Sequence, residues 1–202
     1  ERALLIDSGN GGGDILDAIR RCTAKPVTLV NTHADPDHIG CNHLFPTALM
    51  HPAEFAYYRG TAKPGDAAPL PLWDGEVLDL GGRHVQAVLL PGHTPGTLAL
   101  IDLAHGYLFS SDNLTSGSVF LFGPWRDLRA YAASMERLSL LSNKYKRVFP
   151  SHGDPELGKD QPERQLACAH AVLEGRAAAE DAPSGIPARR YVFAGASVYY
   201  VE

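Results

Sequence analysis

The sequence predicts an α/β fold in which two β-sheets pack face to face between two outer layers of helices, a four-layer αββα sandwich. Strand and helix patterns alternate in the first third of the chain. Four strands with a hydrophobic period of two then follow from Glu76, after which the alternation returns. A sheet covered by helices on one face keeps an apolar second face, so two such sheets bury both faces by packing together.

The first third of the chain is predicted to alternate strands and helices. Residues 3–7 and 27–31 are short runs of mostly aliphatic residues, which is typical of buried strands. Residues 14–22 place three aliphatic side chains on one helical face. The other elements predicted here are a short helix at 41–44, a brief strand at 48–52, a helix that begins at Pro52 and a long loop at 60–75.

The second part of the chain is predicted to begin with an antiparallel meander. Its four strands are expected at 76–82, 84–92, 97–102 and 106–112. An amphipathic helix is predicted at 127–143, with Asp127 as its N-cap. The remaining predictions are an apolar loop at 116–125, a strand at 147–150, a helix at 162–174 and a terminal hairpin at 189–201.

The composition is that of an ordinary globular chain. Its 202 residues are 45% hydrophobic and 20% charged, so we predict a single domain over 1–202. The net charge of −5 gives no basic surface for nucleic acid, and no segment is apolar enough to span a membrane. Three widely spaced cysteines predict reduced thiols in a cytoplasmic protein. We therefore predict a small-molecule substrate, neither nucleic acid nor membrane as partner, and a homodimer as one candidate assembly.

Side chains that bind metals gather after the predicted strands. His33, Asp35, Asp37 and His38 follow the strand at 27–31, and imidazole and carboxylate are groups that divalent metals take. A stretch of six residues cannot supply all the ligands of a catalytic metal site, so further ligands are expected downstream. Further candidates each follow a later strand: His93, Asp112 and His152. Since α/β proteins build their sites at strand ends, we predict that all of these residues meet in one metal site.

Four segments resemble the ligand motifs of a known family. THADPDHIG, LLPGHTPGT, LFSSDN and VFPSHGD are similar, in order and spacing, to the motifs of the metallo-β-lactamase superfamily. The resemblance covers about residues 3–152 and is strongest to glyoxalase II-like and lactonase-like hydrolases. It implies the αββα sandwich already predicted. Members usually carry an extra strand or hairpin before the strand that matches 3–7, so we expect amino-terminal strands to be missing here.

The resemblance also implies a site with two divalent metal ions. One ion would be held by His33, the residue at position 35 and His93, and the other by Asp37, His38 and His152. Asp112 and a water or hydroxide would bridge the two ions, and a shared carboxylate offsets their mutual repulsion. Asp37 is in addition our candidate catalytic residue. Zinc is the first choice of metal, with iron and manganese as alternatives.

Asp35 departs from the common motif, His-x-His-x-Asp-His, because it stands where the second histidine is expected. One interpretation is a carboxylate ligand, as in the flavodiiron branch of the superfamily. The other is the N-cap of a helix that begins at Pro36. As a third ligating carboxylate, Asp35 would lower the positive charge of the site and suit manganese or iron better than an imidazole would.

Residues beside the ligands are candidates for support and for the substrate pocket. Those expected to hydrogen-bond ligands are Thr32, Thr94, Ser111 and Ser151. Those expected to permit tight backbone beside the metals are Gly92, Gly96 and Gly153. Cys41 is interpreted as a small buried hydrophobe. Four residues either floor a pocket or pack in the core: Phe120, Leu121, Phe122 and Trp125.

The sequence therefore predicts a metal-dependent hydrolase in which a metal-bridging hydroxide attacks an ester, thioester or lactone carbonyl. β-Lactamase activity is disfavoured, because the lactam-cleaving relatives usually lack an aspartate at the position of Asp112. Three alternatives stay open at this point. They are a phosphodiesterase, a fragment of a flavodiiron-like oxidoreductase, and a non-catalytic relative with a degraded metal site.

Overall fold

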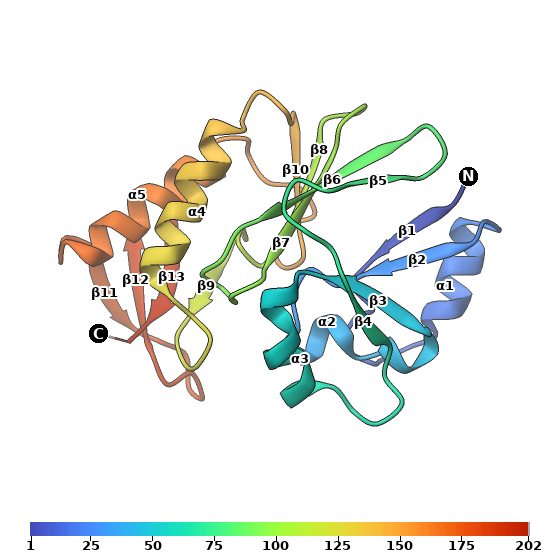
Figure 1. Ribbon diagram of the computed structural model, residues 1–202. Coiled ribbons are helices and arrows are strands. Elements are labelled where there is room, and N and C mark those ends of the chain that lie inside the picture. Colours follow the sequence, from blue (N-terminus) through green and yellow to red (C-terminus); the bar gives the residue numbers. More distant parts are fainter. Residues whose placement is uncertain (202) are drawn as a thin grey trace.

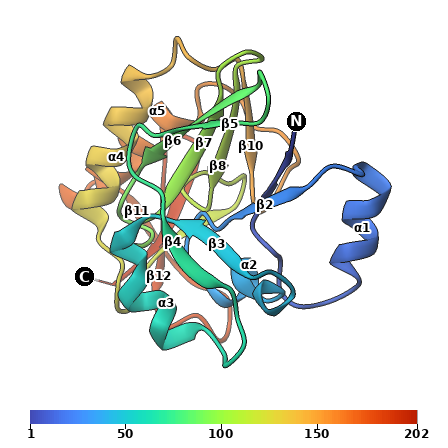
Figure 2. The ribbon, with the colours of Figure 1, turned by 45° about the vertical axis from the view of Figure 1, so that its right-hand side comes forward.

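The computed structural model describes residues 1–201 and contains three sheets (Figures 1 and 2). The first sheet is parallel throughout, in the order β1 (Ala3–Ile6), β2 (Val27–Val30), β3 (Thr47–Met50) and β4 (Ala68–Pro71). The second runs β10 (Arg147–Pro150), β8 (Tyr107–Ser111), β7 (Leu98–Asp102), β6 (His84–Leu89) and β5 (Val77–Asp79). The third runs β11 (Ala178–Asp181), β12 (Arg189–Phe193), β13 (Ala196–Tyr200) and β9 (Ser118–Leu121).

The alternation of side chains along β7 shows how the first two sheets pack. Leu98 and Leu100 point into a core shared with Val30 of the first sheet. Ala99 and Ile101, on the opposite face of the same strand, belong to a different core that contains residues of the long helices. Because successive side chains of a strand face opposite ways, β7 is buried on both sides. The predicted sandwich of two facing sheets is confirmed, and the third sheet is an addition that was not predicted.

Helices form the outer layers (Figures 1 and 2). The long helices α4 (Leu128–Leu140) and α5 (Gln161–Leu173) pack against each other, and α5 contacts β12 and β13 of the third sheet. The outer face of the first sheet is covered by residues of two short helices, α2 (Pro36–Ile39) and α3 (Phe55–Thr61). The first helix, α1 (Ile15–Cys22), has no buried residue, so its aliphatic face is only partly covered.

The strand directions bring the predicted ligands to one edge. β8 and β10 are parallel, and β6 runs the same way because each of β6 and β8 is antiparallel to β7. The carboxyl ends of β6, β8 and β10 therefore lie at the same edge of the second sheet. The chain continues from these ends into His93, Asp112 and His152, so three ligands from distant segments share one edge.

The structure corrects several predicted elements. The loop at 60–75 contains β4 and the loop at 116–125 contains β9, while β11 follows α5 where no strand was predicted. The helix at 41–44 is only a single 3₁₀ turn, η1 (Asn42–Leu44), and a further 3₁₀ turn, η2 (Pro52–Glu54), precedes α3. The meander and the terminal hairpin are confirmed. Asp127 caps α4 by accepting a hydrogen bond from the Ala130 N–H at 2.8 Å.

Among residues 1–201, no helix has both the length and the apolar character needed to cross a bilayer.

Candidate metal centre

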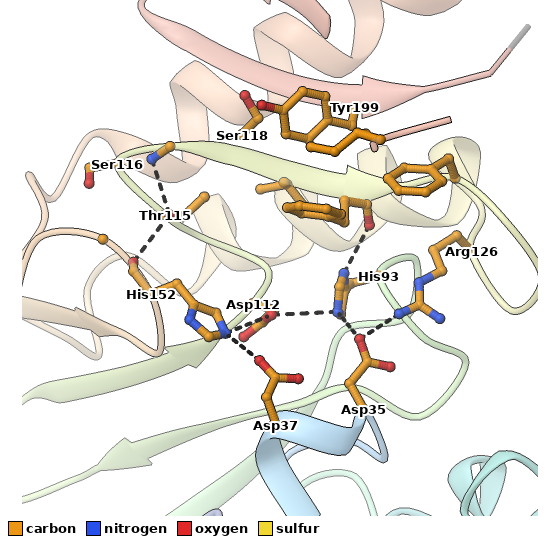
Figure 3. A pocket seen from close by; sticks show the side chains of 16 residues that line it. Asp35, Asp37, His93, Asp112, Thr115, Ser116, Ser118, Arg126, His152 and Tyr199 are labelled. Carbon is orange, nitrogen blue, oxygen red and sulfur yellow. Dashed lines mark hydrogen bonds and ion pairs between the residues drawn. The ribbon is translucent and has the colours of Figure 1, made fainter. Parts of the chain in front are cut away.

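The predicted ligands meet in two neighbouring groups. One consists of His33, His93 and Asp112, and the other of Asp37, His38 and His152; within each group one ligand atom per residue lies within 4.8 Å of the others. Figure 3 shows Asp37 and His152 on one side of Asp112, and His93 with Asp35 on the other. The structure thus brings together residues that lie up to 119 positions apart, as the distance from His33 to His152 in the sequence shows.

In the first group, imidazole nitrogens and carboxylate oxygens face one another. His33 Nε2 lies 3.2 Å from His93 Nε2. Oδ2 of Asp112 is 3.7 Å from His93 Nε2 and 4.0 Å from His33 Nε2. Oδ2 of Asp35 also points here, at 3.3 Å from His93 Nε2 and 3.6 Å from His33 Nε2. Two imidazoles and two carboxylates therefore surround one point.

In the second group, His38 Nε2 and His152 Nε2 are 3.3 Å apart. Oδ2 of Asp37 lies 3.2 Å from His152 Nε2 and 3.6 Å from His38 Nε2. Asp112 faces this group as well, with Oδ1 at 3.2 Å from His38 Nε2 and Oδ2 at 3.3 Å from His152 Nε2. Asp112 is the carboxylate that lies between the two groups.

This donor set fits divalent metal ions. The Nε2 atoms of each pair of imidazoles lie 3.2–3.3 Å apart, which is the separation expected of two nitrogens that each lie about 2.0–2.1 Å from one tetrahedral metal ion. Oδ1 of Asp112 is buried, and the group that it faces is His38 Nε2, at 3.2 Å. Imidazole and carboxylate in equal measure suit zinc, iron or manganese. A pair of bound cations would therefore find imidazole and carboxylate donors already in place.

Hydrogen bonds at Nδ1 aim three of the four imidazoles inward: those of His33, His38 and His93. His93 Nδ1 donates to the Phe120 carbonyl oxygen at 2.9 Å, and His38 Nδ1 donates to Asp7 Oδ2 at 2.8 Å. His33 Nδ1 lies 3.1 Å from Thr32 Oγ1. Because the Thr32 hydroxyl already donates to Asp7, His33 Nδ1 must be the donor. Each of these three rings therefore turns its Nε2 toward the centre and, when neutral, holds the tautomer that a metal ligand needs.

Asp7 is a supporting residue that the sequence analysis missed. Its two oxygens accept hydrogen bonds from the Thr32 N–H and hydroxyl, each at 2.7 Å, in addition to the bond from His38. Its backbone has a left-handed φ of 60°, which is uncommon for a residue with a side chain. Its position directly after β1 could have identified it from the sequence, because the other carboxylates of the site also follow strands.

The carboxylates raise the pKa of the two histidines of the second group when no metal is bound. Burial lowers the pKa of His38, but hydrogen bonds to Asp112 and Asp7 outweigh it and raise the pKa to about 11. Hydrogen bonds to Asp112 and Asp37 raise the pKa of His152 to about 10. The raised pKa values mean that this pair of histidines holds extra proton charge at neutral pH in the metal-free protein, which metal ions must displace to bind.

Asp35 does not cap the helix that follows it. It occupies the N-cap position of α2, but its side chain accepts no capping hydrogen bond. Oδ1 instead accepts a hydrogen bond from the Tyr57 hydroxyl at 2.6 Å, and Oδ2 accepts one from Arg126 Nη2 at 2.5 Å. Burial raises the pKa of Asp35, but hydrogen bonds to His33 and His93 outweigh it and hold the pKa well below its ordinary value.

Of the other residues predicted to support the ligands, some contact the ligand groups and others contact the surrounding core. Ser111 Oγ donates to Thr32 Oγ1 at 2.8 Å, as expected of a residue beside the ligands, whereas Thr94 pairs with Thr97 at 2.6 Å. A side chain at Gly92 would meet Tyr131 at 2.4 Å, and its φ is 137°, so glycine is required there. Cys41 is buried, as predicted.

Glu54 is a second supporting residue without a signal in the sequence. It is fully buried, and its oxygens accept hydrogen bonds from the Ala34 N–H at 3.0 Å and the Gly96 N–H at 2.7 Å. Ala34 lies between His33 and Asp35, and Gly96 lies in the loop that carries His93. One side chain therefore ties together two ligand-bearing loops.

Glu54→Ala is expected to lower the free energy of unfolding by about 2–6 kcal/mol, because two buried N–H groups lose their acceptor and each costs about 1–3 kcal/mol. Urea denaturation of the metal-free protein measures this. Glu156→Ala, which removes an exposed carboxylate paired with Arg147, is the control and should change stability little. Equal urea midpoints for Glu54→Ala and the parent would contradict the assignment.

Five of the seven predicted ligands lie in the wall of a cavity of about 710 Å³: Asp35, Asp37, His93, Asp112 and His152. Figure 3 shows Asp35 and Asp37 directed into it from the α2 region and Tyr199 on the opposite side. Apolar side chains also line it: Val119, Phe120, Phe122 and Ile186. Of the four candidates for a pocket floor, Phe120 and Phe122 therefore line the cavity, Leu121 packs in the core, and Trp125 stacks on Tyr57 at a centroid distance of 5.7 Å.

Comparison with known proteins gives a family and named relatives. A family model described as the metallo-beta-lactamase superfamily matches residues 1–152. Acyl-coenzyme A thioesterase MBLAC2 of Homo sapiens is 31% identical over 165 residues, which cover 67% of this chain and 58% of that protein. Hydroxyacylglutathione hydrolase of Gloeobacter violaceus is 33% identical over 104 residues, which cover 51% of this chain and 40% of that protein. The chain thus spans less than two thirds of the length of both.

Among solved structures, "Crystal structure of TTHA1623 in a di-iron-bound form" matches with a TM-score of 0.64 and 31% sequence identity. The match covers 80% of this chain and 87% of that chain.

Proposed function

The chain is a metallo-hydrolase that belongs to the metallo-beta-lactamase superfamily, and on that premise we propose that it hydrolyses a small ester, thioester or lactone. The observation that carries the proposal is the convergence of four imidazole Nε2 atoms on Asp112 in the wall of an open cavity. The relatives named as a thioesterase and a hydroxyacylglutathione hydrolase support carbonyl substrates.

We propose that the seven predicted ligands hold two divalent metal ions. His33, Asp35 and His93 would hold one, while Asp37, His38 and His152 would hold the other, with Asp112 shared. Zinc is the first choice; the solved relative described as di-iron-bound supports iron as an alternative, with manganese as a further one. When bound, the ions would acidify a bridging water so that it attacks at neutral pH, and would polarise the substrate carbonyl.

Asp37 is proposed as the residue that moves the proton. It lines the cavity, its side chain is 45% exposed, and Oδ2 faces His152 Nε2 at 3.2 Å. As the water oxygen bonds to the acyl carbon, Oδ1 can accept the proton that the water loses. The carboxyl group then donates this proton to the departing oxygen or sulfur as the C–O or C–S bond breaks. The products are a carboxylic acid and an alcohol or thiol.

The cavity supports a substrate with an apolar acyl or aryl part. Phe120 lies 5.0 Å from Tyr199 and 5.5 Å from Phe122, measured between ring centroids, so three aromatic rings are grouped along one wall. Its volume is within the usual range of about 300–1,000 Å³ for small-molecule sites. Tyr199 and Ile186 lie beyond the segment that matches the family model. The homodimer and the cytoplasmic location stay predictions.

The proposal is tested with zinc-reconstituted protein on a panel of model substrates. We expect turnover of p-nitrophenyl esters, an acyl-coenzyme A, a hydroxyacylglutathione or an acyl-homoserine lactone to exceed that of bis-p-nitrophenyl phosphate by at least about a hundredfold in kcat/KM, a difference of about 2.7 kcal/mol in barrier. Turnover of the phosphodiester alone would favour a phosphodiesterase. Turnover of no substrate by a fully metal-loaded protein would favour a non-catalytic relative.

A further inference from the structure

The carboxylate of Asp35 is held from two sides by residues outside the set of seven ligands. Oδ2, the oxygen that faces His33 and His93, accepts a hydrogen bond from Arg126 Nη2 at 2.5 Å, and Oδ1 accepts one from Tyr57. The ion pair is secluded, because the Asp35 side chain is 14% exposed and the Arg126 side chain 13%. Figure 3 shows Arg126 directed at Asp35 across the cavity wall.

The backbone before Arg126 shows that this placement is built into the fold. Trp125 has a left-handed φ of 73°, which costs a residue with a side chain free energy that surrounding contacts must offset. Its indole stacks on the Tyr57 ring at 5.7 Å, and the guanidinium carbon of Arg126 lies 5.6 Å from the centroid of the same ring. Tyr57 therefore contacts both residues and Asp35, so the four side chains form one connected unit.

The charges of Asp35 and Arg126 affect metal binding, because both side chains adjoin the proposed metal centre. Two dications would bring four positive charges, and the carboxylates of Asp35, Asp37 and Asp112 would remove three. Arg126 adds one positive charge directly against Asp35. The centre would then carry the same net charge as one in which position 35 is neutral and no arginine is present. Charges this close and this secluded interact strongly.

We propose that Arg126 is a positioning residue that aims the Asp35 carboxylate at His33 and His93 and cancels its charge, so that position 35 acts as an electrically neutral ligand. The role rests on the proposed metal centre. It predicts that Asp35 and Arg126 are coupled: a neutral residue at position 35 is tolerated only when the arginine is neutralised too, since otherwise a secluded guanidinium faces two dications unpaired.

The test is a double-mutant cycle read out by zinc affinity, measured by competition with a chromophoric chelator on the parent, Asp35→His, Arg126→Leu and the double variant. In the Asp35→His background, Arg126→Leu is expected to strengthen zinc binding by about tenfold or more. In the parent it should leave zinc binding unchanged or weaken it, because the donor that aims Asp35 is lost as well. Shifts that agree within about threefold in the two backgrounds, or that reverse this order, overturn the proposal.

Two controls keep the outcome clear. Arg20→Leu removes the same charge from an exposed arginine on α1 that pairs with Asp14 and Asp17, and it should not change zinc affinity. If Asp35→His does not fold, Asp35→Asn replaces it in the cycle with the same expected sign. A parent protein that binds none of zinc, iron and manganese overturns the proposed function and this inference together. A parent that binds zinc with uncoupled variants overturns only the role of Arg126.

Discussion

Asp112→Ala is expected to reduce kcat/KM by about three orders of magnitude or more. Asp112 is the carboxylate that faces both ligand groups, with oxygens 3.2–4.0 Å from the Nε2 atoms of four histidines. Its loss would leave two dications without a shared anion, and Lewis-acid stabilisation is worth several kcal/mol at about 1.36 kcal/mol per tenfold in rate. Steady-state kinetics on the best ester substrate, together with metal content per chain, measure the effect.

A control must separate this loss from a general loss of stability. Asp102→Ala removes another buried carboxylate, one that pairs with Arg83 and His105 far from the cavity. It should lower the melting temperature while leaving the metal content intact. Asp112→Asn keeps the shape of the side chain and removes its charge, and should resemble Asp112→Ala in both metal content and activity. Parental activity in Asp112→Ala would show that Asp112 is not the shared ligand.

Removal of metal is expected to abolish hydrolysis, and adding metal back should restore it together with stability. A ligand that binds only the folded protein stabilises it by about 2.7 kcal/mol at a hundred times its dissociation constant. Zinc should therefore raise the melting temperature in a concentration-dependent way. Thermal denaturation after chelator dialysis, with zinc, iron or manganese restored, measures both effects. Less than about half an equivalent of metal after soaking would contradict the two-metal proposal.

The stability of the metal-free protein and its affinity for zinc are both expected to depend on pH, in opposite directions. The pKa values of His38 and His152 in the metal-free fold, about 11 and about 10, lie above the ordinary value of 6.5. Their ion pairs therefore stabilise the metal-free protein fully below about pH 6.5. That contribution is lost as pH rises toward 10–11. Metal binding follows the opposite trend, because it displaces these protons. Calorimetry at pH 7 in buffers of different ionisation enthalpy should show protons released on zinc binding.

The ligand-bearing strands could be predicted from the sequence because their signals are local. The runs that become β2, β8 and β10 are mostly apolar, and each is followed within three residues by a predicted ligand: His33, Asp112 or His152. Burial of an apolar strand and exposure of its polar end are both written in neighbouring residues. That two sheets face each other was also predictable, since a sheet with two apolar faces needs a partner on each side, whereas the separate third sheet was not predicted.

Of the three strands that were not predicted, β4 and β9 gain their stability from partners remote in the sequence. β4 contains Pro69 and Pro71 and lies at the edge of its sheet, where a residue without an N–H is tolerated. β9 gains its hydrogen bonds from β13, with Phe120 opposite Tyr199. Neither strand has a local pattern that separates it from a loop. Each forms because it pairs with a strand that another part of the chain supplies.

The sequence by itself determined which residues can bind metal and in what order they reach one sheet edge, because strand ends and ligand chemistry are local properties. Only the tertiary structure decided what Asp35 does. The sequence allowed a helix cap or a ligand. In the fold the carboxylate makes no capping hydrogen bond and points toward His33 and His93. Arg126, 91 residues away in the sequence, forms an ion pair with it. An ion pair across that distance depends on how α2, α3 and the loop before α4 pack, and no short segment specifies such packing.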